Sequence, residues 1–432
     1  MKWNSAEVSA PLLTERQQIR SPFRFVLLLG LLDAFGPLGI DMYLPAFPQM
    51  QSDLNASPGG IQLTLAVFLA GLAVGQLVMG PISDRSGRRG PLLFGAVAFA
   101  ISSLVCALAT SLEALLAARF LMGLAGSSGM VIARAVVRDT YNEQESARVY
   151  SLLMLVIGVA PILSPSLGSW LMELGRWPVI FYALGLFALI CAVALVVDLP
   201  ETHPPERRTR SSVGKLTGQY LRLLINFRYM GYALVGSLAL GQIFAYVSSA
   251  PLYFMEIVGL SPKWFTVVFA GNAIGLIGIA QVNRYLMVRF TTHAILRGAL
   301  LLNVLVCATL LLLVATNIGG FAAQMVALFL CLTTLGLILP NVTAAVMAPF
   351  PDCAGVAAAL YGTLQFAIGA GTGAVIGMLE NGTPGPMSWM IAACSGLALV
   401  IGMLVEWQRR VEMRVSAPES IASESISVNE LA

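Results

Sequence analysis

Three charged residues lie inside long apolar segments of the sequence, where a charge is costly and therefore marks a candidate functional residue. Asp33 and Asp41 belong to the segment LLDAFGPLGIDMYLP, and Arg119 belongs to ARFLMGLAG. The spacing of the two acids places them on one side of an α-helix at two depths, separated by a rise of about 12 Å. Buried carboxylates can bind a proton or a cationic substrate. The sequence therefore predicts a proton and substrate site at Asp33 and Asp41.

Pro37 lies between the two acids and predicts a kink in their helix, because its missing N–H frees the carbonyl of Asp33. Arg119 is expected about 10 Å below the outer membrane surface, close to the depth of Asp41. Since a lone buried arginine needs a partner, we expect Arg119 to pair with Asp41. Two other interpretations stay open. One or both acids could form structural salt bridges, or Arg119 could be a structural residue whose side chain extends to the membrane surface.

The composition indicates a membrane protein. Of the 432 residues, 57% are apolar and 11% are charged, whereas about 25% of a soluble domain is charged. This excludes a water-soluble enzyme and a disordered protein. One membrane span needs about 20 apolar residues, and the segments that qualify are Phe23–Pro45, Ile61–Ile82, Pro91–Thr110, Leu112–Ala133, Val149–Leu171, Pro178–Leu199, Tyr229–Tyr253, Trp264–Arg284, Ala294–Ala315, Gly319–Pro340, Ala354–Leu379 and Pro386–Trp407. The sequence therefore predicts an all-α polytopic membrane protein with twelve transmembrane helices.

The basic residues predict the orientation of these helices. If the N-terminus lies in the cytoplasm, 22 of the 25 Lys and Arg residues fall on the cytoplasmic side. Only Arg176 and Lys263 then fall outside, and Arg119 lies within a span. This bias places both termini in the cytoplasm. Residues 1–22 are polar, and the apolar run after them is too long for a signal peptide, so we expect an uncleaved cytoplasmic tail.

A hydrophilic segment, residues 200–228, divides the predicted spans into two sets of six. It is rich in proline and then basic, as expected of a cytoplasmic linker. The predicted six-helix bundles cover residues 23–199 and 229–408, and we expect them to be parallel pseudo-repeats around a central cavity. The Ser- and Glu-rich segment 409–432 is predicted to be a disordered cytoplasmic tail.

Two further segments have unusual patterns. Residues 80–90, GPISDRSGRRG, form a charged turn between the second and third spans. This turn either latches helix ends on the cytoplasmic side or serves only as a positive-inside anchor. The fifth span contains GVAPILSPSLG, in which prolines bend the helix and small residues allow close packing. The residues concerned are Gly158, Pro161, Pro165 and Gly168.

The sequence lacks the motifs of an enzyme. Its two histidines, His203 and His293, and its six scattered cysteines form no pattern of metal ligands. A G-x-S-x-G nucleophile motif and a nucleotide-binding loop are both absent from the sequence. We therefore expect no enzymatic activity, no metal, no cofactor and no nucleic-acid partner.

Several of these segments resemble one transporter superfamily. GPISDRSGRR resembles the signature loop of the major facilitator superfamily, and ARFLMGLAG resembles the second motif of its drug exporters. APILSPSLG resembles the antiporter motif, although Ser164 and Ser169 stand where glycines are usual. IDMYLPAFP, ARAVVRDTY and LPETHPPERR resemble the bicyclomycin and chloramphenicol resistance (Bcr/CflA) drug-efflux family. The similarity covers residues 23–408.

The resemblance implies the twelve-helix major facilitator fold and a drug:proton antiporter of the bacterial inner membrane, with the proton gradient as its energy source. Asp41 matches the helix-1 acid of the family, and an acid at Asp33 resembles the chloramphenicol and multidrug exporters. The implied cytoplasmic gate consists of Gly80, Asp84, Arg85, Gly87, Arg88 and Arg89. Asp84 would lie near the start of the eleventh helix. Two departures stand out: Met122 replaces a usual glutamine, and NRYLMVRF is a degenerate second copy of the gate.

The expected function is proton-coupled export of small amphipathic drugs by alternating access, with Asp41 as the coupling acid and Arg119 as its partner when the site is empty. An exporter of one native metabolite is the first alternative, and a channel or non-transporting scaffold is the second. Buried charges and bent helices favour a transporter. The expected partners are drug molecules, protons and the lipid bilayer, and the protein is expected to be a monomer.

Cysteines introduced at Ser57 and Asn381 should react with a membrane-impermeant maleimide added to intact cells, because the charge bias places both positions outside. A cysteine at Ser211, in the basic linker, should react only after the membrane has been permeabilised. Labelling of Ser211→Cys in intact cells would overturn the orientation.

Overall fold

The computed structural model describes residues 22–208, 213–350 and 353–416, and every regular element in these ranges is a helix. The first half of the chain contains α1 (Pro22–Asp33), α2 (Phe35–Asp41), η2 (Leu44–Ala46), α3 (Phe47–Leu54), α4 (Pro58–Ser86), α5 (Arg89–Ala107), α6 (Leu112–Thr140), α7 (Glu143–Leu174) and α8 (Pro178–Asp198). The remainder contains η3 (Pro205–Arg207), α9 (Val213–Ile225), α10 (Phe227–Pro251), η4 (Leu252–Ile257), α11 (Pro262–Arg289), α12 (Thr292–Thr316), α13 (Gly320–Met347), α14 (Ala354–Leu379) and α15 (Gly385–Ser416).

Ten of the described helices are long and apolar enough to cross a membrane. They are α4, α5, α6, α8, α11, α12, α13, α14, α15 and the continuous helix made by α10 and η4. The bent pair of α1 with the segment α2–α3 gives an eleventh candidate. α7, which contains the fifth predicted span, has several side chains outside the described part of the structure and is not among the ten. The described residues therefore support ten or eleven spans, and the count of twelve stays a prediction.

The first predicted span is broken beside Asp33. α1 ends at Asp33 and α2 begins at Phe35, and the two parts of the span differ in direction by 42°. Because Pro37 has no N–H, it cannot donate the helical hydrogen bond that the carbonyl of Asp33 would accept. The hydrogen-bond ladder resumes where the Leu38 N–H donates to the Ala34 carbonyl at 2.9 Å. The predicted kink is confirmed.

Side-chain caps determine where several helices begin. At the start of α4, Ser57 Oγ accepts a hydrogen bond from the N–H of Gly60 at 3.1 Å. At the start of α7, Asn142 and Glu145 form a reciprocal capping box. Each cap satisfies an N–H group that the first turn of a helix leaves without an intrahelical partner. The polar residues that flank an apolar segment therefore lengthen its helix beyond the apolar core.

α15 continues beyond the last predicted span and ends at Ser416. Glu406 forms ion pairs with Arg409 at 3.0 Å and with Arg410 at 3.3 Å, and pairs three and four residues apart stabilise a helix. The helix thus extends into residues 409–432, which the sequence predicts to be a disordered tail. The residues after Ser416, like the N-terminal tail before α1, lie outside the described part of the chain.

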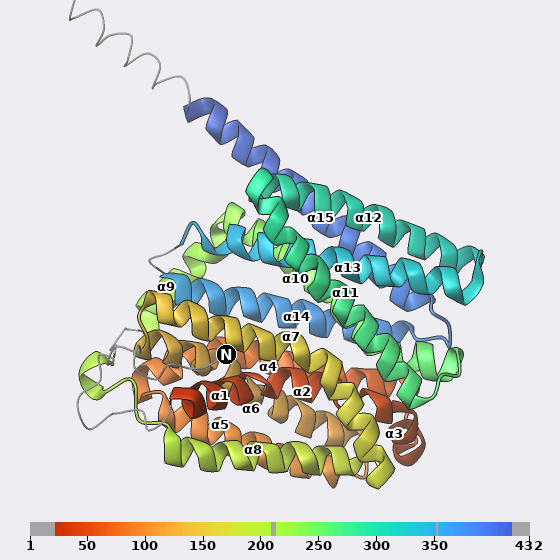
Figure 1. Ribbon diagram of the computed structural model, residues 1–432, viewed down its shortest axis with the longest axis horizontal. Coiled ribbons are helices and arrows are strands. Elements are labelled where there is room, and N and C mark those ends of the chain that lie inside the picture. Colours follow the sequence, from red (N-terminus) through yellow and green to blue (C-terminus); the bar gives the residue numbers. More distant parts are fainter. Residues whose placement is uncertain (1–21, 209–212, 351–352, 417–432) are drawn as a thin grey trace, which may run out of the picture.

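The helices form two layers, one from each half of the chain (Figure 1). α14 packs along α4, and α11 packs against α7, so these two helix pairs join the halves. The backbones of α4 and α14 come so close that a Cβ atom on Gly59 would lie 2.0 Å from the carbonyl oxygen of Gly377. The end of the molecule at which α9 and the chain after α8 lie is called the linker end below, and the opposite end is called the far end (Figure 1).

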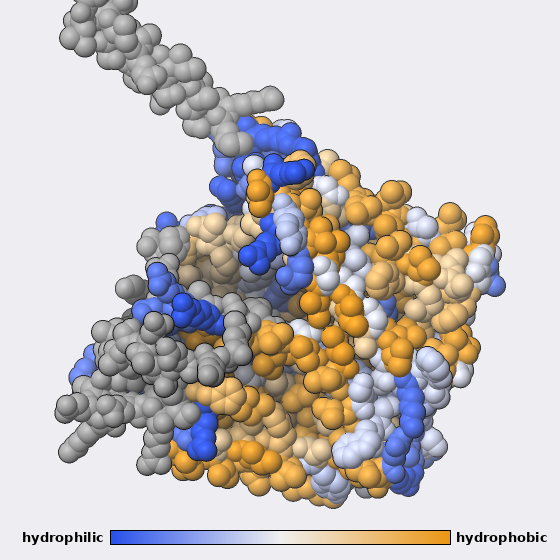
Figure 2. Space-filling view, viewed as in Figure 1, coloured by the Kyte–Doolittle hydropathy of each residue, from blue (hydrophilic) through white to orange (hydrophobic). Residues whose placement is uncertain are grey.

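The outer surface of the molecule between these two ends is apolar. On α8, for example, Leu186 and Val193 are 61% and 62% exposed. Figure 2 shows apolar residues over most of the visible face, with hydrophilic residues gathered toward the two ends. A surface of this kind matches the hydrocarbon core of a bilayer with polar regions on either side.

Two glycines allow α4 and α6 to pack in close contact. A Cβ atom on Gly71 would lie 2.2 Å from the carbonyl oxygen of Phe120, and one on Gly123 would lie 2.1 Å from the carbonyl oxygen of Phe68. Small residues at such a crossing let two helix backbones approach closely. This contact matters for the site because it brings Arg119 of α6 next to the side chains of α4.

Gly71→Ala should lower the thermal unfolding midpoint of the purified protein, because the new Cβ atom would overlap the Phe120 carbonyl and push α6 away. Forced overpacking of this kind costs about 1–3 kcal/mol. Gly396→Ala in α15 is the matched control, since nothing lies within 4 Å of its Cβ position and alanine favours a helix. Equal unfolding midpoints for the two variants would contradict a tight contact between α4 and α6.

Candidate functional site

Asp33 is fully buried at the end of α1, and within the described part of the chain neither oxygen of its carboxylate has a hydrogen-bond partner. It forms an ion pair with Arg134 of α6, whose Nη2 lies 3.8 Å from Asp33 Oδ1. The side chain of Arg134 is 46% exposed, so this pair is long and open to water on one side. The carboxylate is therefore neutralised only in part, which leaves it able to accept a proton or a cationic group.

Asp41 is buried at the end of α2, and among the described residues it forms no ion pair. It lies close enough to the hydroxyl of Tyr246 in α10 for the two groups to interact electrostatically. That hydroxyl accepts a hydrogen bond from Asn272 Nδ2 of α11 at 2.9 Å. Asp41 thus lies near the boundary between the two halves of the chain, within electrostatic range of a tyrosine of the second half.

Arg119 is fully buried, and aromatic rings cover its guanidinium group. Its Cζ lies 4.2 Å from the ring centres of both Tyr43 and Phe68, an arrangement that favours a cation. Arg119 Nη2 donates to the carbonyl of Gly39 at 2.9 Å, and Nε donates to the carbonyl of Thr64 at 3.4 Å. The arginine therefore binds the backbone of the last turn of α2, where carbonyls lack helical donors.

The expected ion pair between Arg119 and Asp41 is not formed in this structure. Two carbonyls and two aromatic rings contact the guanidinium group instead. The alternative in which Arg119 extends to the membrane surface is also wrong, because its side chain is 0% exposed. Met122, which replaces a usual glutamine, still contacts the arginine, since its Sδ lies 3.6 Å from Nη1.

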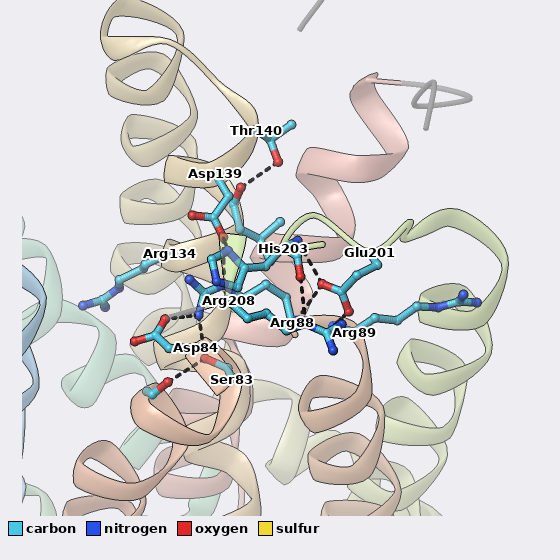
Figure 3. A network of polar contacts seen from close by, with 12 residues as sticks. Ser83, Asp84, Arg88, Arg89, Arg134, Asp139, Thr140, Glu201, His203 and Arg208 are labelled. Atoms are coloured by element: carbon cyan, nitrogen blue, oxygen red, sulfur yellow. Dashed lines mark hydrogen bonds and ion pairs between the residues drawn. The ribbon is translucent and has the colours of Figure 1, made fainter. Parts of the chain in front are cut away.

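A second cluster of charges surrounds Arg88 at the linker end (Figure 3). Arg88 is 2% exposed, and its Nη1 donates to Asp84 Oδ1 at 2.5 Å and to Ser83 Oγ at 2.8 Å. Its Nε donates to Asp139 Oδ2, at the end of α6, at 2.7 Å. Ser83 in turn donates to the carbonyl of Gly80 at 2.9 Å. Arg88 therefore joins the end of α4 to the end of α6.

Glu201, which follows α8, caps the beginning of α5. Its carboxylate accepts hydrogen bonds from the backbone N–H groups of Arg88 at 2.8 Å and Arg89 at 3.3 Å, where a helix favours negative charge. Gly87 has φ +94°, and a Cβ atom on it would lie 2.4 Å from Glu201 Oε2, so glycine is required there. Arg89 Nη2 donates to the carbonyl of Val196 at 2.7 Å and ties α5 to α8.

Ion pairing outweighs burial at Arg88. Burial alone lowers the pKa of its guanidinium group, but hydrogen bonds and ion pairs with Asp139 and Asp84 raise the pKa above its ordinary value. His203 adds a further group to the cluster, since its Nδ1 lies 3.8 Å from Asp139 Oδ2. Arg85 lies in the last turn of α4. The predicted gate residues thus lie together, and their contacts hold the first half of the chain as one unit.

The eleventh predicted helix is α14, and the structure shows no hydrogen bond or ion pair between Asp84 and this helix among the described residues. Asp84 pairs with Arg88 and also lies near Tyr220 of α9, whose pKa is raised by burial and then by that carboxylate. A charged side chain of the first half that does approach the start of α14 is that of Arg138, whose Nη1 lies 3.6 Å from the Cβ position of Gly355. Asp84 is thus held within the first half of the chain rather than by α14.

The unusual residues of α7 lie between the first span and the second half. A Cβ atom on Gly168 would lie 1.8 Å from the carbonyl oxygen of Met42, and one on Gly158 would lie 3.8 Å from Ile277 of α11. Pro161 and Pro165 lie inside the helix. The two ends of this segment therefore contact different halves of the molecule. A relative motion of the two halves would change the contacts of α7.

Five residues of these clusters did not emerge as candidates from the sequence. They are Arg134, Asp139, Glu201, Tyr246 and Asn272. Arg134 follows directly after a predicted span, so its charge looked like that of a loop. Asp139 and Glu201 belong to ARAVVRDTY and LPETHPPERR, which carried a family resemblance but no assigned role. Tyr246 and Asn272 are single polar residues in apolar spans, and only their position opposite Asp41 distinguishes them.

Comparison with known proteins agrees with this architecture. A family model described as Major Facilitator Superfamily matches residues 29–374. The chain is 38% identical over 383 residues to YdgK of Bacillus subtilis (strain 168), an uncharacterized MFS-type transporter, covering 87% of this chain and 93% of the relative. It is 30% identical to a bicyclomycin resistance protein homolog of Haemophilus influenzae, over 87% and 94% of the two chains. It is 32% identical to a chloramphenicol resistance protein of Pseudomonas aeruginosa, over 87% and 88%.

A solved structure has the same fold. A D-xylose-proton symporter matches with a TM-score of 0.71 at 14% sequence identity, over 89% of this chain and 97% of the other. The family match covers most of the chain, several relatives share at least 30% identity, and the described residues form an all-helical bundle with ten or eleven apolar spans. The chain therefore belongs to the Major Facilitator Superfamily and is a multi-pass membrane transporter, with relatives named as drug resistance proteins.

Proposed function

We propose that this transporter is a proton-coupled antiporter that exports small amphipathic drugs, of the chloramphenicol and bicyclomycin kind, from the bacterial cytoplasm. The observation that carries this proposal is the environment of Asp41. Its carboxylate is buried, lies within electrostatic range of Tyr246 of the second half, and has no ion pair among the described residues. The relatives named for bicyclomycin and chloramphenicol resistance support the substrate class.

The proposed membrane arrangement has twelve spans in the inner membrane, as two six-helix bundles over residues 23–199 and 229–408. The linker 200–228 and both termini lie in the cytoplasm, so that the linker end is the cytoplasmic end. The distribution of Lys and Arg supports this orientation. The transporter works as a monomer, and the proton gradient supplies the energy without a cofactor.

Asp41 is proposed to carry the coupled proton. A carboxylate without a counter-ion in a dry site favours its protonated form. It can therefore take a proton from the acidic outside and release it inward when a drug molecule arrives. Proton and drug then exclude each other on one carrier, which is the condition for antiport. Arg119 contributes by holding the carbonyl of Gly39, which positions the last turn of α2 and with it Asp41.

Alternating access requires that contacts between the halves form and break at each end. At the far end, Gln51 Nε2 of α3 donates to Glu256 Oε1 at 2.5 Å. Lys263 Nζ of α11 lies 2.8 Å from Glu173 Oε1 of α7. Both contacts join the first half to the second, so the structure is held closed at the far end. Opening toward the outside must break them, and both pairs are partly exposed, which keeps that cost low.

Asp41→Asn should abolish drug-induced proton release from the purified protein and uphill export into proteoliposomes, because an amide cannot exchange the coupled proton. Asp33→Asn should reduce transport of cationic drugs more than that of neutral drugs, because it removes a buried negative charge that Arg134 neutralises only in part. Both effects are measured with a fluorescent pH indicator and with one cationic and one neutral drug.

Glu113→Gln is the matched control for both variants, since it removes an exposed carboxylate at the start of α6. It should leave proton release and export unchanged. Proton release by Asp41→Asn equal to that of the control would place the proton site elsewhere. Expression of the unaltered protein in a pump-deficient bacterium should give resistance to chloramphenicol and bicyclomycin, and growth without any resistance would contradict drug export.

The cluster around Arg88 is proposed to act as a cytoplasmic gate that moves with the first half as a rigid unit. Asp139→Asn should slow transport more than Asp84→Asn, because the Asp139 side chain is 14% exposed and the Asp84 side chain is 44% exposed, and water screens the more exposed pair. Transport rates are compared at equal amounts of protein in the membrane. Normal transport rates for both variants would show that residues 80–90 serve only as a positive-inside anchor.

A further inference from the structure

The second half of the chain has a basic pocket at the linker end that the transport mechanism does not use. The pocket lies between α10, α12 and α15, and the polar part of its lining consists of Tyr232, His293, Arg297 and Glu406. Tyr232 and His293 are joined by a contact of 3.2 Å between the tyrosine hydroxyl and His293 Nδ1. The remaining lining is apolar. The pocket is therefore a polar site set into a membrane-facing part of the bundle.

Positive charge exceeds negative charge around this pocket. Glu406 is the one acidic residue of the lining, and it is already shared by Arg409 at 3.0 Å and Arg410 at 3.3 Å. Arg228 lies close enough to His293 to influence it electrostatically, and its Nε is buried with no hydrogen-bond partner among the residues that the structure describes. Arg297 and Arg228 are thus two further arginines in or near the pocket, and Glu406 is not paired with either of them among the described residues.

Arg297 is the cation with the clearest need of a partner. It is the sixth residue of α12, about 7.5 Å along the helix from its start, and its side chain is exposed. Among the residues that the structure describes it forms no ion pair or hydrogen bond. The next turns of α12 present Leu301 and Leu305, which are 48% and 66% exposed. An arginine at the edge of such a surface can bind an anionic group at the membrane–water boundary.

The apolar rim continues on the neighbouring helix. Met403 and Trp407 of α15 are 47% and 68% exposed, and Met403 also lines the pocket. Figure 2 shows hydrophilic residues gathered near the end from which α15 projects, directly beside the apolar surface of the second half. Cations above exposed apolar side chains match the two parts of a phospholipid, its headgroup and its acyl chains.

We propose that this pocket binds the headgroup of an anionic phospholipid from the leaflet at the linker end. Its phosphate is bound by Arg297 and the neighbouring arginines, and its acyl chains lie on the exposed apolar side chains of α12 and α15. Guanidinium groups bind phosphate oxygens strongly, and basic pockets between membrane helices hold acidic headgroups. The apolar rim favours a lipid over free phosphate, because free phosphate has the anionic group but no acyl chains.

The test uses the full-length protein in nanodiscs of phosphatidylcholine with and without phosphatidylglycerol. Native mass spectrometry counts the phosphatidylglycerol retained per protein, and thermal unfolding measures stability. Arg297→Gln should weaken retention about fivefold, which corresponds to ~1 kcal/mol for one arginine at an anionic surface. Arg148→Gln is the matched control, because Arg148 is an exposed arginine at the same place in α7, its sixth residue.

Phosphatidylglycerol should raise the unfolding midpoint of the unaltered protein and of Arg148→Gln, and should raise that of Arg297→Gln less. All three proteins should unfold at the same temperature in phosphatidylcholine alone, which shows that the variants are folded. Equal retention by Arg297→Gln and Arg148→Gln would overturn the proposal. A stabilisation by inorganic phosphate in detergent as large as that by phosphatidylglycerol would overturn the assignment to a lipid.

Discussion

The hydrogen bond from Arg119 to the carbonyl of Gly39 holds together the part of the molecule on which the site depends. A guanidinium group in the interior of a membrane bundle has no water to solvate it, so the protein must supply every partner. Here the partners are two carbonyls and the faces of two aromatic rings. The carbonyl is available because α2 ends within one turn of it. The end of α2 at Asp41 and the buried arginine of α6 therefore satisfy each other.

This arrangement leaves Asp41 free. Had Arg119 taken the carboxylate as its partner, the acid would be neutralised and held within the first half. Instead the carboxylate lies within electrostatic range of Tyr246 of the second half, and that tyrosine accepts a hydrogen bond from Asn272. The electrostatic free energy of a charge at the boundary between the two halves changes when they separate. Its surroundings then change from dry protein to water. In the proposed mechanism, the protonation of Asp41 is therefore linked to the separation of the two halves.

At the linker end, hydrogen bonds and ion pairs of charged residues connect the helices of the first half to one another. Arg88 joins α4 to α6, Glu201 caps α5, and Arg89 reaches α8. These contacts are short and partly buried, and none of them crosses to the second half. At the far end the halves meet through close glycine contacts such as that of Gly59 with Gly377, and through the exposed pair of Lys263 with Glu173. Backbone contacts of this kind permit rocking more readily than buried ion pairs, whose rupture leaves an unpaired charge.

The sequence by itself determined the helical elements, the break at Pro37 and the identity of the buried charges. These features depend on local properties: apolar length, a missing N–H and the cost of a charge in an apolar segment. The relationship to the superfamily also followed from short motifs. What the sequence left undecided were the partners of those charges. Depth along a helix matched Arg119 to Asp41, but only the packing of α6 against α2 and α4 decided that the guanidinium group meets a carbonyl and two rings. Arg134 and Tyr246 became neighbours of the two acids for the same reason. Which side chains meet depends on how helices rotate and approach one another, and that is fixed by the tertiary structure rather than by position along any one helix.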